Sequence, residues 1–344
     1  MQQKLRDLHE ARQEKPLRTY RNALANKPEV AFGPDEVSKP SFLGQKKLVE
    51  FDLKEIVPFI DWTFFFSAWE LNGRFPAILK HPKMGEAATE LYEHGRALLD
   101  RIVNEKLLTA QAVYGFWPAN SDGDDIVLYT NDSRSEELHR FPMLRQQEDL
   151  AQGKFNRSLA DYVAPKDSGV EDYLGAFAVT TGLGTETLVD AFKAELDDYN
   201  AIMVQALADR LAEAFAEYLH ARARKDWGIA PYAGESKEDL VKENYRGIRP
   251  AFGYPACPDH SAKQTLFKLL DATEIGLELT ESCAISPAAS VSGLYFGHPA
   301  TKYFTVGRLD RDQMRSYAKR QGVELKVVEK WLAPNLAYDP EEVA

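Results

Sequence analysis

The stretch QAVYGFWPANSDGDDIVLYT at residues 111–130 decides the fold class. Both of its ends are rich in the aromatic and β-branched residues that favour strands, which predicts strands at 111–117 and 125–130. The residues SDGD at 121–124 are a hairpin signal, because glycine and aspartate accept the backbone geometry of a tight turn. The stretch therefore predicts an antiparallel strand pair.

The segments around this hairpin alternate irregularly between helical and extended patterns. A parallel sheet would need a steadier alternation of strands and helices. We therefore predict an α+β fold, a single large domain with a mostly antiparallel, twisted sheet flanked by helices, and not a Rossmann fold. Apolar spacing predicts two helices within 185–226, further helices at 1–14, 86–107, 236–245 and 261–272 and from about 310 and 324 onward, and strands at 172–180, 289–296 and 302–308.

The composition limits the kind of protein. At 344 residues and 44% hydrophobic content the chain can bury a large core, and its net charge of −11 argues against a general nucleic-acid binder. No run of about 18 apolar residues exists, so we expect no membrane span. The N-terminus lacks the apolar segment of a secretory signal. Only two cysteines occur, so a disulfide framework is excluded and we expect a cytoplasmic protein.

The N-terminal region differs from the rest of the chain. Residues 15–45 contain four prolines among polar residues and show no sustained period, which is typical of an extended linker. We predict an N-terminal helix and linker at 1–45, followed by one compact domain at 46–344.

Two motifs resemble known ligand sites without completing them. TTGLGTE at 180–186 follows a predicted strand and precedes a helix, but it lacks the third glycine and the acidic partner of a nucleotide-binding fingerprint. Cys257, Asp259 and His260 could bind a metal, but a structural zinc site needs four ligands in paired motifs, and Cys283 is isolated. We therefore predict a structural turn at 180–186, and no metal site, with Cys257 as a buried thiol and Asp259 as a helix-capping residue.

Three acidic residues are candidates for different roles. Glu213 and Glu217 lie four residues apart on a predicted helix, opposite its apolar stripe, which is typical of a solvated face. Asp61 lies among apolar and aromatic neighbours in FIDWTFFF, where an ionised carboxylate is costly without a partner. Asp61 can cap a helix, pair within the core or bind a cationic ligand group.

RGIRPAFGYPACPDH at 246–260 is predicted to be a stiff loop, because its prolines fix φ and remove backbone donors. Gly253 permits the backbone to approach a ligand closely. Arg249 can bind a carboxylate through two parallel hydrogen bonds. The loop is either a cradle for a carboxylate ligand or a rigid connection.

Tyr303 and Phe304 are adjacent on a predicted strand, so their side chains should point to opposite faces. Core packing is the usual role of such a pair, and stacking on a flat ligand such as adenine is the alternative.

Long segments of the chain resemble the C-terminal activation domain of cobalamin-dependent methionine synthase. The resemblance covers about residues 50–340. The segments are FIDWTFFF at 59–66, DYLGAFAVTTGL at 172–183, DDYNAIMVQALADRLAEAFAEYLHAR at 197–222, ENYRGIRPAFGYPACPDH at 243–260, LTESCAISPAASVSGLYFGHP at 279–299, KYFTVGRLDRDQ at 302–313 and VEKWLAPNLAYD at 328–339.

The resemblance implies a domain that binds S-adenosylmethionine as the methyl donor for reductive methylation of cob(II)alamin, with an electron from a flavodoxin-type donor. It implies that Arg249, Gly253 and Tyr254 form the family's RxxxGY signature, in which the arginine holds the methionine carboxylate. It also implies that Asp61 lies at the ligand's amino group and that Glu213 is a further acid beside the ligand.

The resemblance also assigns Tyr303 and Phe304 to an aromatic pair at the ligand, with phenylalanine where some members have a second tyrosine. The chain contains neither the DxHxxG motif that ligates cobalamin nor the cysteines of a homocysteine-activating zinc site. We therefore expect cobalamin to come from a partner domain or subunit, and we do not expect this chain alone to make methionine. A partner-docking scaffold without autonomous catalysis is the alternative.

Overall fold

The computed structural model describes residues 16–229 and 245–341. Its strands are β1 (Gly44–Phe51), β2 (Thr109–Asp122), β3 (Asp125–Tyr129), β4 (Glu137–Pro142), β5 (Asp172–Leu183), β6 (Glu278–Leu279), β7 (Ile285–Ser286) and β8 (Ser290–Tyr295). Its helices are α2 (Tyr20–Ala25), α3 (Leu53–Ile56), α4 (Gly85–Glu105), α5 (Thr185–Ala194), α6 (Asp198–Asp226), α8 (Lys263–Leu270), α9 (Arg311–Gln321) and α10 (Leu325–Trp331).

Six strands form one antiparallel sheet in the order β4-β3-β2-β5-β8, with β1 as a further neighbour of β2. β2 is long enough to pair with two strands along one edge. Its first half pairs with β1, where Phe116 lies opposite Gly44, and its end continues through the turn at Gly123 into β3. The φ of Gly123 is +63°, a conformation that suits glycine in the predicted hairpin.

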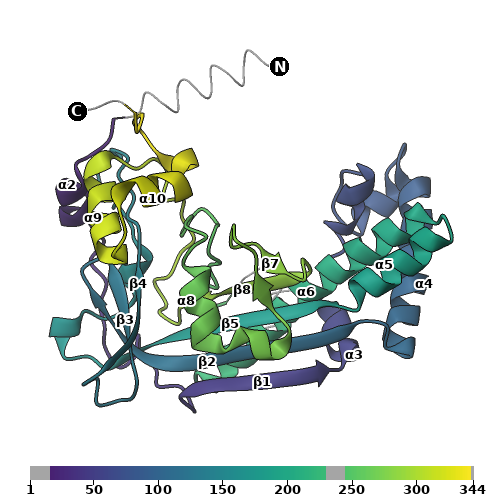
Figure 1. Ribbon diagram of the computed structural model, residues 1–344, viewed down its shortest axis with the longest axis horizontal. Coiled ribbons are helices and arrows are strands. Elements are labelled where there is room, and N and C mark those ends of the chain that lie inside the picture. Colours follow the sequence, from purple (N-terminus) through teal and green to yellow (C-terminus); the bar gives the residue numbers. More distant parts are fainter. Residues whose placement is uncertain (1–15, 230–244, 342–344) are drawn as a thin grey trace.

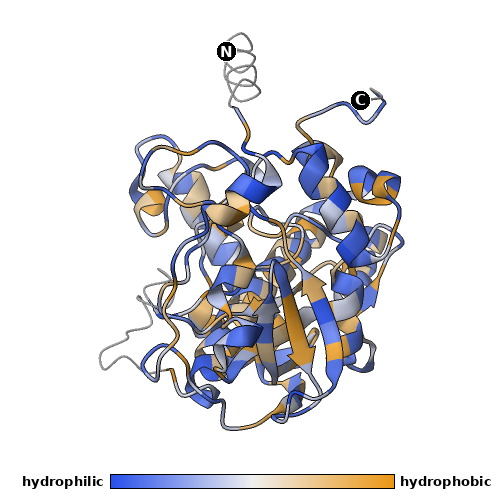
Figure 2. Ribbon diagram, turned by 90° about the vertical axis from the view of Figure 1, so that its left-hand side faces the viewer, coloured by the Kyte–Doolittle hydropathy of each residue, from blue (hydrophilic) through white to orange (hydrophobic). Residues whose placement is uncertain are grey.

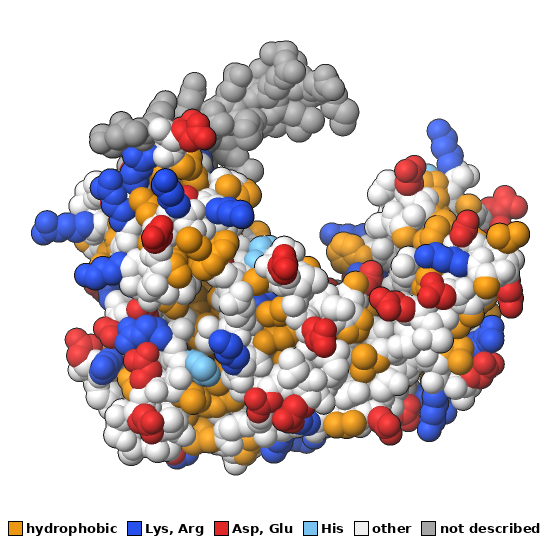
Figure 3. Space-filling model, in the orientation of Figure 1, with side chains coloured by type: hydrophobic (Ala, Val, Ile, Leu, Met, Phe, Trp, Pro, Cys, Tyr) orange, Lys and Arg blue, Asp and Glu red, His pale blue; other side chains and the backbone are white. Residues whose placement is uncertain are grey.

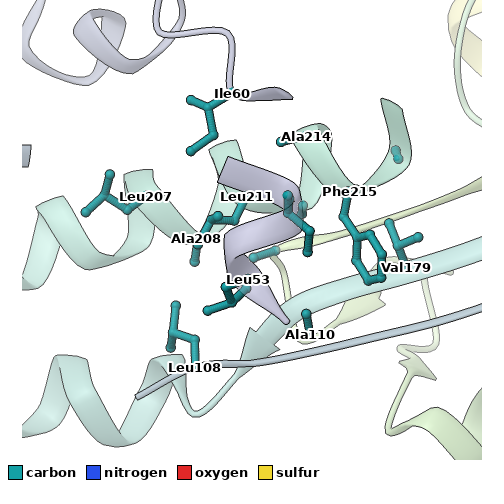
Figure 4. Packing of buried hydrophobic residues seen from close by; sticks show 14 of the residues in the cluster. Leu53, Ile60, Leu108, Ala110, Val179, Leu207, Ala208, Leu211, Ala214 and Phe215 are labelled. Atoms are coloured by element: carbon teal, nitrogen blue, oxygen red, sulfur yellow. The ribbon is translucent and has the colours of Figure 1, made fainter. Parts of the chain in front are cut away.

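Side chains alternate between two cores on opposite faces of this sheet. On β5, Phe177 and Val179 pack into the core formed with α3, α4 and α6, whereas Ala176 and Ala178 pack into the core formed with α8. Figure 4 shows the first core, in which Leu53 of α3 lies between α6 and the sheet. Figure 2 shows the corresponding pattern along the ribbon, with hydrophobic stretches in the strands and mixed stretches along the helices.

α6 is the central helix of the domain. Its N-terminus is capped by Asp197, which accepts a hydrogen bond from the backbone N–H of Asn200 at 3.0 Å. Of the predicted apolar stripe, Leu207, Leu211, Phe215 and Leu219 are fully buried and Tyr218 is half-buried. Figure 4 shows Leu207, Leu211 and Phe215 in the core. Because 15 of the 29 residues of α6 are buried, the helix is covered on more than the side that faces the sheet.

Two arms rise from the ends of the sheet and leave a hollow between them (Figures 1 and 3). One arm carries β3, β4, α9 and α10, and the other carries α4 and α5. A separate small hydrophobic cluster holds α9 and α10 together. In the described parts of the chain, no helix is both long and apolar enough to cross a membrane.

The predicted α+β class and antiparallel sheet are confirmed, and the hairpin, α4, α5, α6, α8, α9, β5 and β8 lie close to their predicted positions. β1 and β4 were not predicted, because both are partly exposed edge strands without clear apolar alternation. The last helix ends at Trp331 instead of continuing to the C-terminus. The predicted helices at 1–14 and 236–245 lie outside the described residues.

Residues 16–43, which the sequence predicts as linker, lie against the domain in the structure. The guanidinium of Arg246 donates a hydrogen bond to the backbone oxygen of Glu36. The indole N–H of Trp227 donates to the backbone oxygen of Ser38 at 2.9 Å. Side chains of the domain therefore satisfy carbonyls of a segment that forms only the short helix α2.

Candidate functional site

Two adjoining cavities form one groove beside the loop at 248–257, which packs against β8. Their volumes are about 540 and about 440 Å³. Glu213, Arg249 and Tyr254 line both cavities and form the junction between them. The larger half is mainly apolar and aromatic, and its walls include Phe177, Val291, Tyr303 and Phe304. The smaller half is more polar and includes Asp61, Arg210 and Glu217.

The loop at 248–257 is held by backbone hydrogen bonds on two sides. The N–H of Leu294 in β8 donates to the carbonyl oxygen of Pro250 at 3.0 Å. The N–H of Val306 donates to the carbonyl oxygen of Pro255 at 2.8 Å. Because the prolines cannot donate, the sheet and residues 302–308 supply the donors that fix this loop over the groove.

Arg249 forms an ion pair beneath the junction of the groove. Its Nη2 lies 2.6 Å from Oε2 of Glu217 on α6, and the two side chains are only 14% and 7% exposed. Its Nη1 contacts the hydroxyl of Tyr245, and it lies 3.4 Å from Nδ1 of His220. A guanidinium has only donors, so Nδ1 of His220 is the acceptor and the imidazole proton is on Nε2.

His220 is a buried neutral histidine. Burial lowers its pKa well below the usual range, and the nearby guanidinium groups of Arg249 and Arg224 lower the pKa further. The ring stacks on Tyr295 of β8, with centroids 4.9 Å apart and planes 4° apart. Tyr295 stacks in turn on Phe177 of β5, at 4.5 Å and 11°. This stack of three rings connects the surroundings of Arg249 to the wall of the larger half.

Glu217 is not on a solvated face, contrary to the prediction. It is 5% exposed, because β8 and Arg249 pack against this second side of α6. Arg249 supplies the opposite charge that a buried carboxylate needs. Glu213, one turn earlier, is exposed and borders both halves of the groove.

Asp61 lies in the smaller half of the groove and is half-buried. Its Oδ1 accepts a hydrogen bond from the backbone N–H of Thr63 at 2.8 Å, so it stabilises a turn and does not cap a helix. Phe64 beside it is 62% exposed, with the guanidinium of Arg210 5.7 Å from its ring centroid. The aromatic run around Asp61 is therefore only partly core.

Tyr303 and Phe304 do not point to opposite faces of a strand, because residues 302–308 form no strand. Both side chains line the larger half of the groove. Tyr303 is 49% exposed, and its hydroxyl accepts a hydrogen bond from the backbone N–H of Arg249 at 3.1 Å. Phe304 also packs against two hydrophobic clusters.

The Cys257, Asp259 and His260 group has a structural role. The buried thiol of Cys257 donates to a backbone carbonyl of the loop, and Asp259 accepts a hydrogen bond from the hydroxyl of Tyr317 at 2.6 Å. Asp259 stabilises a turn before α8 and does not cap the helix, whose N-cap is Ala262. Among the residues described, no three His, Cys, Asp or Glu side chains form a group that could hold a metal ion.

TTGLGTE forms the turn between β5 and α5. Gly184, with a φ of +96°, is the N-cap of the helix. β5 is antiparallel to both of its neighbours, whereas a dinucleotide fingerprint requires a parallel strand-helix-strand unit. The structural interpretation of this motif therefore agrees with the topology.

The groove brings together every binding residue that the sequence predicts: Asp61, Glu213, Arg249, Tyr254, Tyr303 and Phe304. The sequence interpretation missed Glu217, His220 and Phe177. The sequence contained one signal that Glu217 is buried. The alanines around it in LAEAFAEYLH are typical of a helix that is closely packed on several sides.

Two comparisons with known proteins agree with this geometry. A family model described as the activation domain of vitamin B12-dependent methionine synthase matches residues 52–322. The chain is also similar to a crystal structure of the MetH reactivation domain bound to AdoHcy. The sequence identity is 47% and the TM-score is 0.90, and the match covers 94% of this chain and 100% of the other. The chain therefore belongs to the family of vitamin B12-dependent methionine synthase activation domains.

Proposed function

We propose that this chain is the reactivation module of a methionine synthase, which binds S-adenosylmethionine in the groove for the reductive methylation of cob(II)alamin in methionine biosynthesis. The observation that carries the proposal is the position of Arg249, between an aromatic and an acidic half of one groove. S-adenosylmethionine combines a flat adenine, a cationic sulfonium and an amino-acid tail. The similar MetH domain is bound to AdoHcy. AdoHcy differs from S-adenosylmethionine only because it lacks the transferable methyl group, so this structure supports the same ligand class.

The residues present fit this ligand. The two halves, of about 540 and about 440 Å³, have the size of small-molecule sites. In this proposal Arg249 binds the ligand carboxylate, and Asp61 in the smaller half binds the ammonium group. Glu213 at the junction is a second acid that favours a cationic ligand.

The aromatic residues hold the other end of the ligand in this proposal. Tyr303 and Phe304 present ring faces in the larger half, where adenine can stack. Phe304 contributes a ring without a hydroxyl group. Tyr254, which is 62% exposed, borders both halves and covers the middle of the ligand.

The chain's own residues bind and orient the methyl donor, and none is assigned as a catalytic acid or base. When bound, the sulfonium supplies a methyl group whose displacement needs no general base. The methyltransferase role of the chain is therefore that of the reactivation part only.

We further propose that a cytoplasmic partner domain or subunit, connected through residues 1–45, carries the cobalamin, and that a flavodoxin-type protein supplies the electron. The hollow between the two arms leaves room for a second domain to approach (Figure 3).

Calorimetric titration with S-adenosylmethionine tests the ligand. We expect the wild-type chain to bind, and Arg249→Ala to weaken binding by at least about tenfold, because a charged hydrogen-bonding partner of the carboxylate is lost. Arg315→Ala removes an exposed arginine of α9 outside the groove and should leave the affinity unchanged. No heat with the wild-type chain, or equal affinity of Arg249→Ala, would contradict the proposal.

A further inference from the structure

Glu217 is an unusual residue for its position in α6. The residue is 5% exposed, and the buried residues next to it in the helix include alanine, leucine and phenylalanine. A buried ion pair gives little net stability, and well-packed apolar side chains often serve a fold equally well. The packing of α6 therefore does not require a glutamate here, which points to a role of the ion pair at Arg249.

Arg249 is a flexible side chain that needs fixing. Holding an arginine in one rotamer costs side-chain entropy. In the structure Glu217 holds Nη2 at 2.6 Å, while Tyr245 and His220 contact Nη1. Protein groups therefore orient the guanidinium through both terminal nitrogens. Preorganisation of this kind raises affinity, because it reduces the ordering cost of binding.

The supporting groups are themselves fixed. The ring of His220 lies flat on Tyr295 and makes an edge contact with Tyr245, with centroids 4.9 Å apart in each case. Because its pKa is lowered, His220 stays neutral near pH 7 and accepts from Arg249 without repelling it. Among Glu217, Tyr245 and His220, it is Glu217 that contributes a charge opposite to that of Arg249.

We propose that Glu217 is a positioning residue for the ligand: its buried carboxylate orients the Arg249 guanidinium toward the carboxylate of the bound amino-acid tail. The inference rests on the proposed function, because it concerns the same groove. Repulsion between Glu217 and the ligand carboxylate is the opposing effect. Orientation outweighs repulsion here, because the charge of Glu217 is already compensated by direct contact and a guanidinium can bind two carboxylates on different edges.

The test compares two ligands that differ in the tail. S-adenosylmethionine carries the carboxylate, whereas 5′-methylthioadenosine keeps the adenosyl part and lacks the amino-acid tail. We expect Glu217→Gln to raise the dissociation constant for S-adenosylmethionine about tenfold and to leave that for 5′-methylthioadenosine within about twofold. Glu217→Asp keeps the charge but shortens the side chain, so its loss should be intermediate.

Glu329→Gln is the matched control. Glu329 is also buried, 6% exposed, and accepts a hydrogen bond from Tyr338 at 2.6 Å in a part of the domain outside the groove. This variant reports the general effect of removing a buried carboxylate, and both affinities should stay at wild-type values. Binding of 5′-methylthioadenosine also shows that a Glu217 variant is folded.

Three results would overturn the positioning role. Tighter binding of S-adenosylmethionine by Glu217→Gln would mean that repulsion dominates. An equal loss for both ligands would mean that Glu217 only maintains the fold, and unchanged affinities would mean that it does neither. If the wild-type chain binds neither ligand, the proposed function itself fails, which is a distinguishable outcome.

Discussion

The carbonyl oxygen of Pro250 occupies the space in which a side chain at Gly293 of β8 would begin. A β-carbon at Gly293 would stand 2.5 Å from that oxygen and 3.0 Å from the ring of Phe177. The oxygen of Pro250 is fixed by its hydrogen bond with the N–H of Leu294. The ring of Phe177 is fixed by stacking on Tyr295. The missing side chain of Gly293 is what lets the loop at 248–257 lie close to the sheet.

Gly293→Ala should therefore displace the loop from β8. We expect a loss of about 1–3 kcal/mol in the free energy of unfolding, as in other overpacked sites, and weaker binding of S-adenosylmethionine. Chemical denaturation and calorimetric titration measure the two effects. Full affinity with unchanged stability would show that the loop tolerates the methyl group and that the close approach is not needed.

Gly253 presents a different constraint inside the same loop. Its φ is +94°, and a β-carbon there would stand 2.2 Å from Cε1 of His260. Gly253→Ala thus combines backbone strain, about 1–3 kcal/mol, with displacement of the imidazole from Lys263, whose Nζ lies 3.0 Å from Nδ1. We expect it to lower the melting temperature and to weaken ligand binding.

A matched control separates the two costs of Gly253→Ala. Gly153 has a similar φ of +82° but open space around its α-carbon, so Gly153→Ala carries the backbone strain alone. Adding His260→Ala should recover part of the loss in Gly253→Ala, since contacting residues are not additive. Strict additivity of Gly253→Ala and His260→Ala would refute the steric explanation.

Tyr303 contributes a ring and a hydroxyl group that mutations can separate. Tyr303→Phe removes the hydroxyl that accepts a hydrogen bond from the backbone N–H of Arg249. We expect the affinity for S-adenosylmethionine to fall about two- to tenfold. Tyr303→Ala also removes the stacking face, which is worth about 1–3 kcal/mol for an aromatic base.

The melting temperature distinguishes Tyr303 from its neighbour. Tyr303 is 49% exposed, so Tyr303→Ala should affect binding more than stability. Phe304→Ala should lower both the affinity for the ligand and the melting temperature, because Phe304 lines the groove and also packs against two hydrophobic clusters. The assignment of Tyr303 to the ligand fails if Tyr303→Ala binds S-adenosylmethionine as tightly as the wild-type chain.

His220 should make folding sensitive to acid. Its pKa is depressed in the folded state, so the unfolded chain takes up a proton that the folded chain refuses. The stability contribution is present above the ordinary histidine pKa of about 6.5 and is lost as pH falls below that value. Urea denaturation from pH 7.5 to 5 should show this loss.

His220→Gln should reduce the pH slope of unfolding by up to about 1.4 kcal/mol per pH unit, the effect of one proton. The exchange lowers stability at every pH, so the slope is the informative quantity. His94→Gln, on the exposed face of α4, reports the effect of the same exchange outside the core. An unchanged slope in His220→Gln would mean that this histidine is not the buried neutral group.

Much of the fold follows from local patterns in the sequence. Apolar spacing predicted α4 and α6, and the SDGD turn predicted the β2–β3 hairpin, because these signals involve residues a few positions apart. β1 escaped prediction because its stability comes from pairing with β2, far along the chain, and not from its own pattern. Residues 302–308 have strand-like composition, but the N–H of Val306 donates to the loop at 248–257 and not to a strand ladder.

The sequence by itself determined the chemistry of the groove: an arginine on a proline-rich loop, acids on α6 and before it, and adjacent aromatic residues, in segments that resemble one family. Only the tertiary structure decided which of these groups are buried and paired. Glu213 and Glu217 look alike on a helical wheel, yet one is exposed and the other is neutralised by Arg249. The reason is physical, because burial and ion pairing depend on what distant segments place against a side chain, and local spacing carries no record of that.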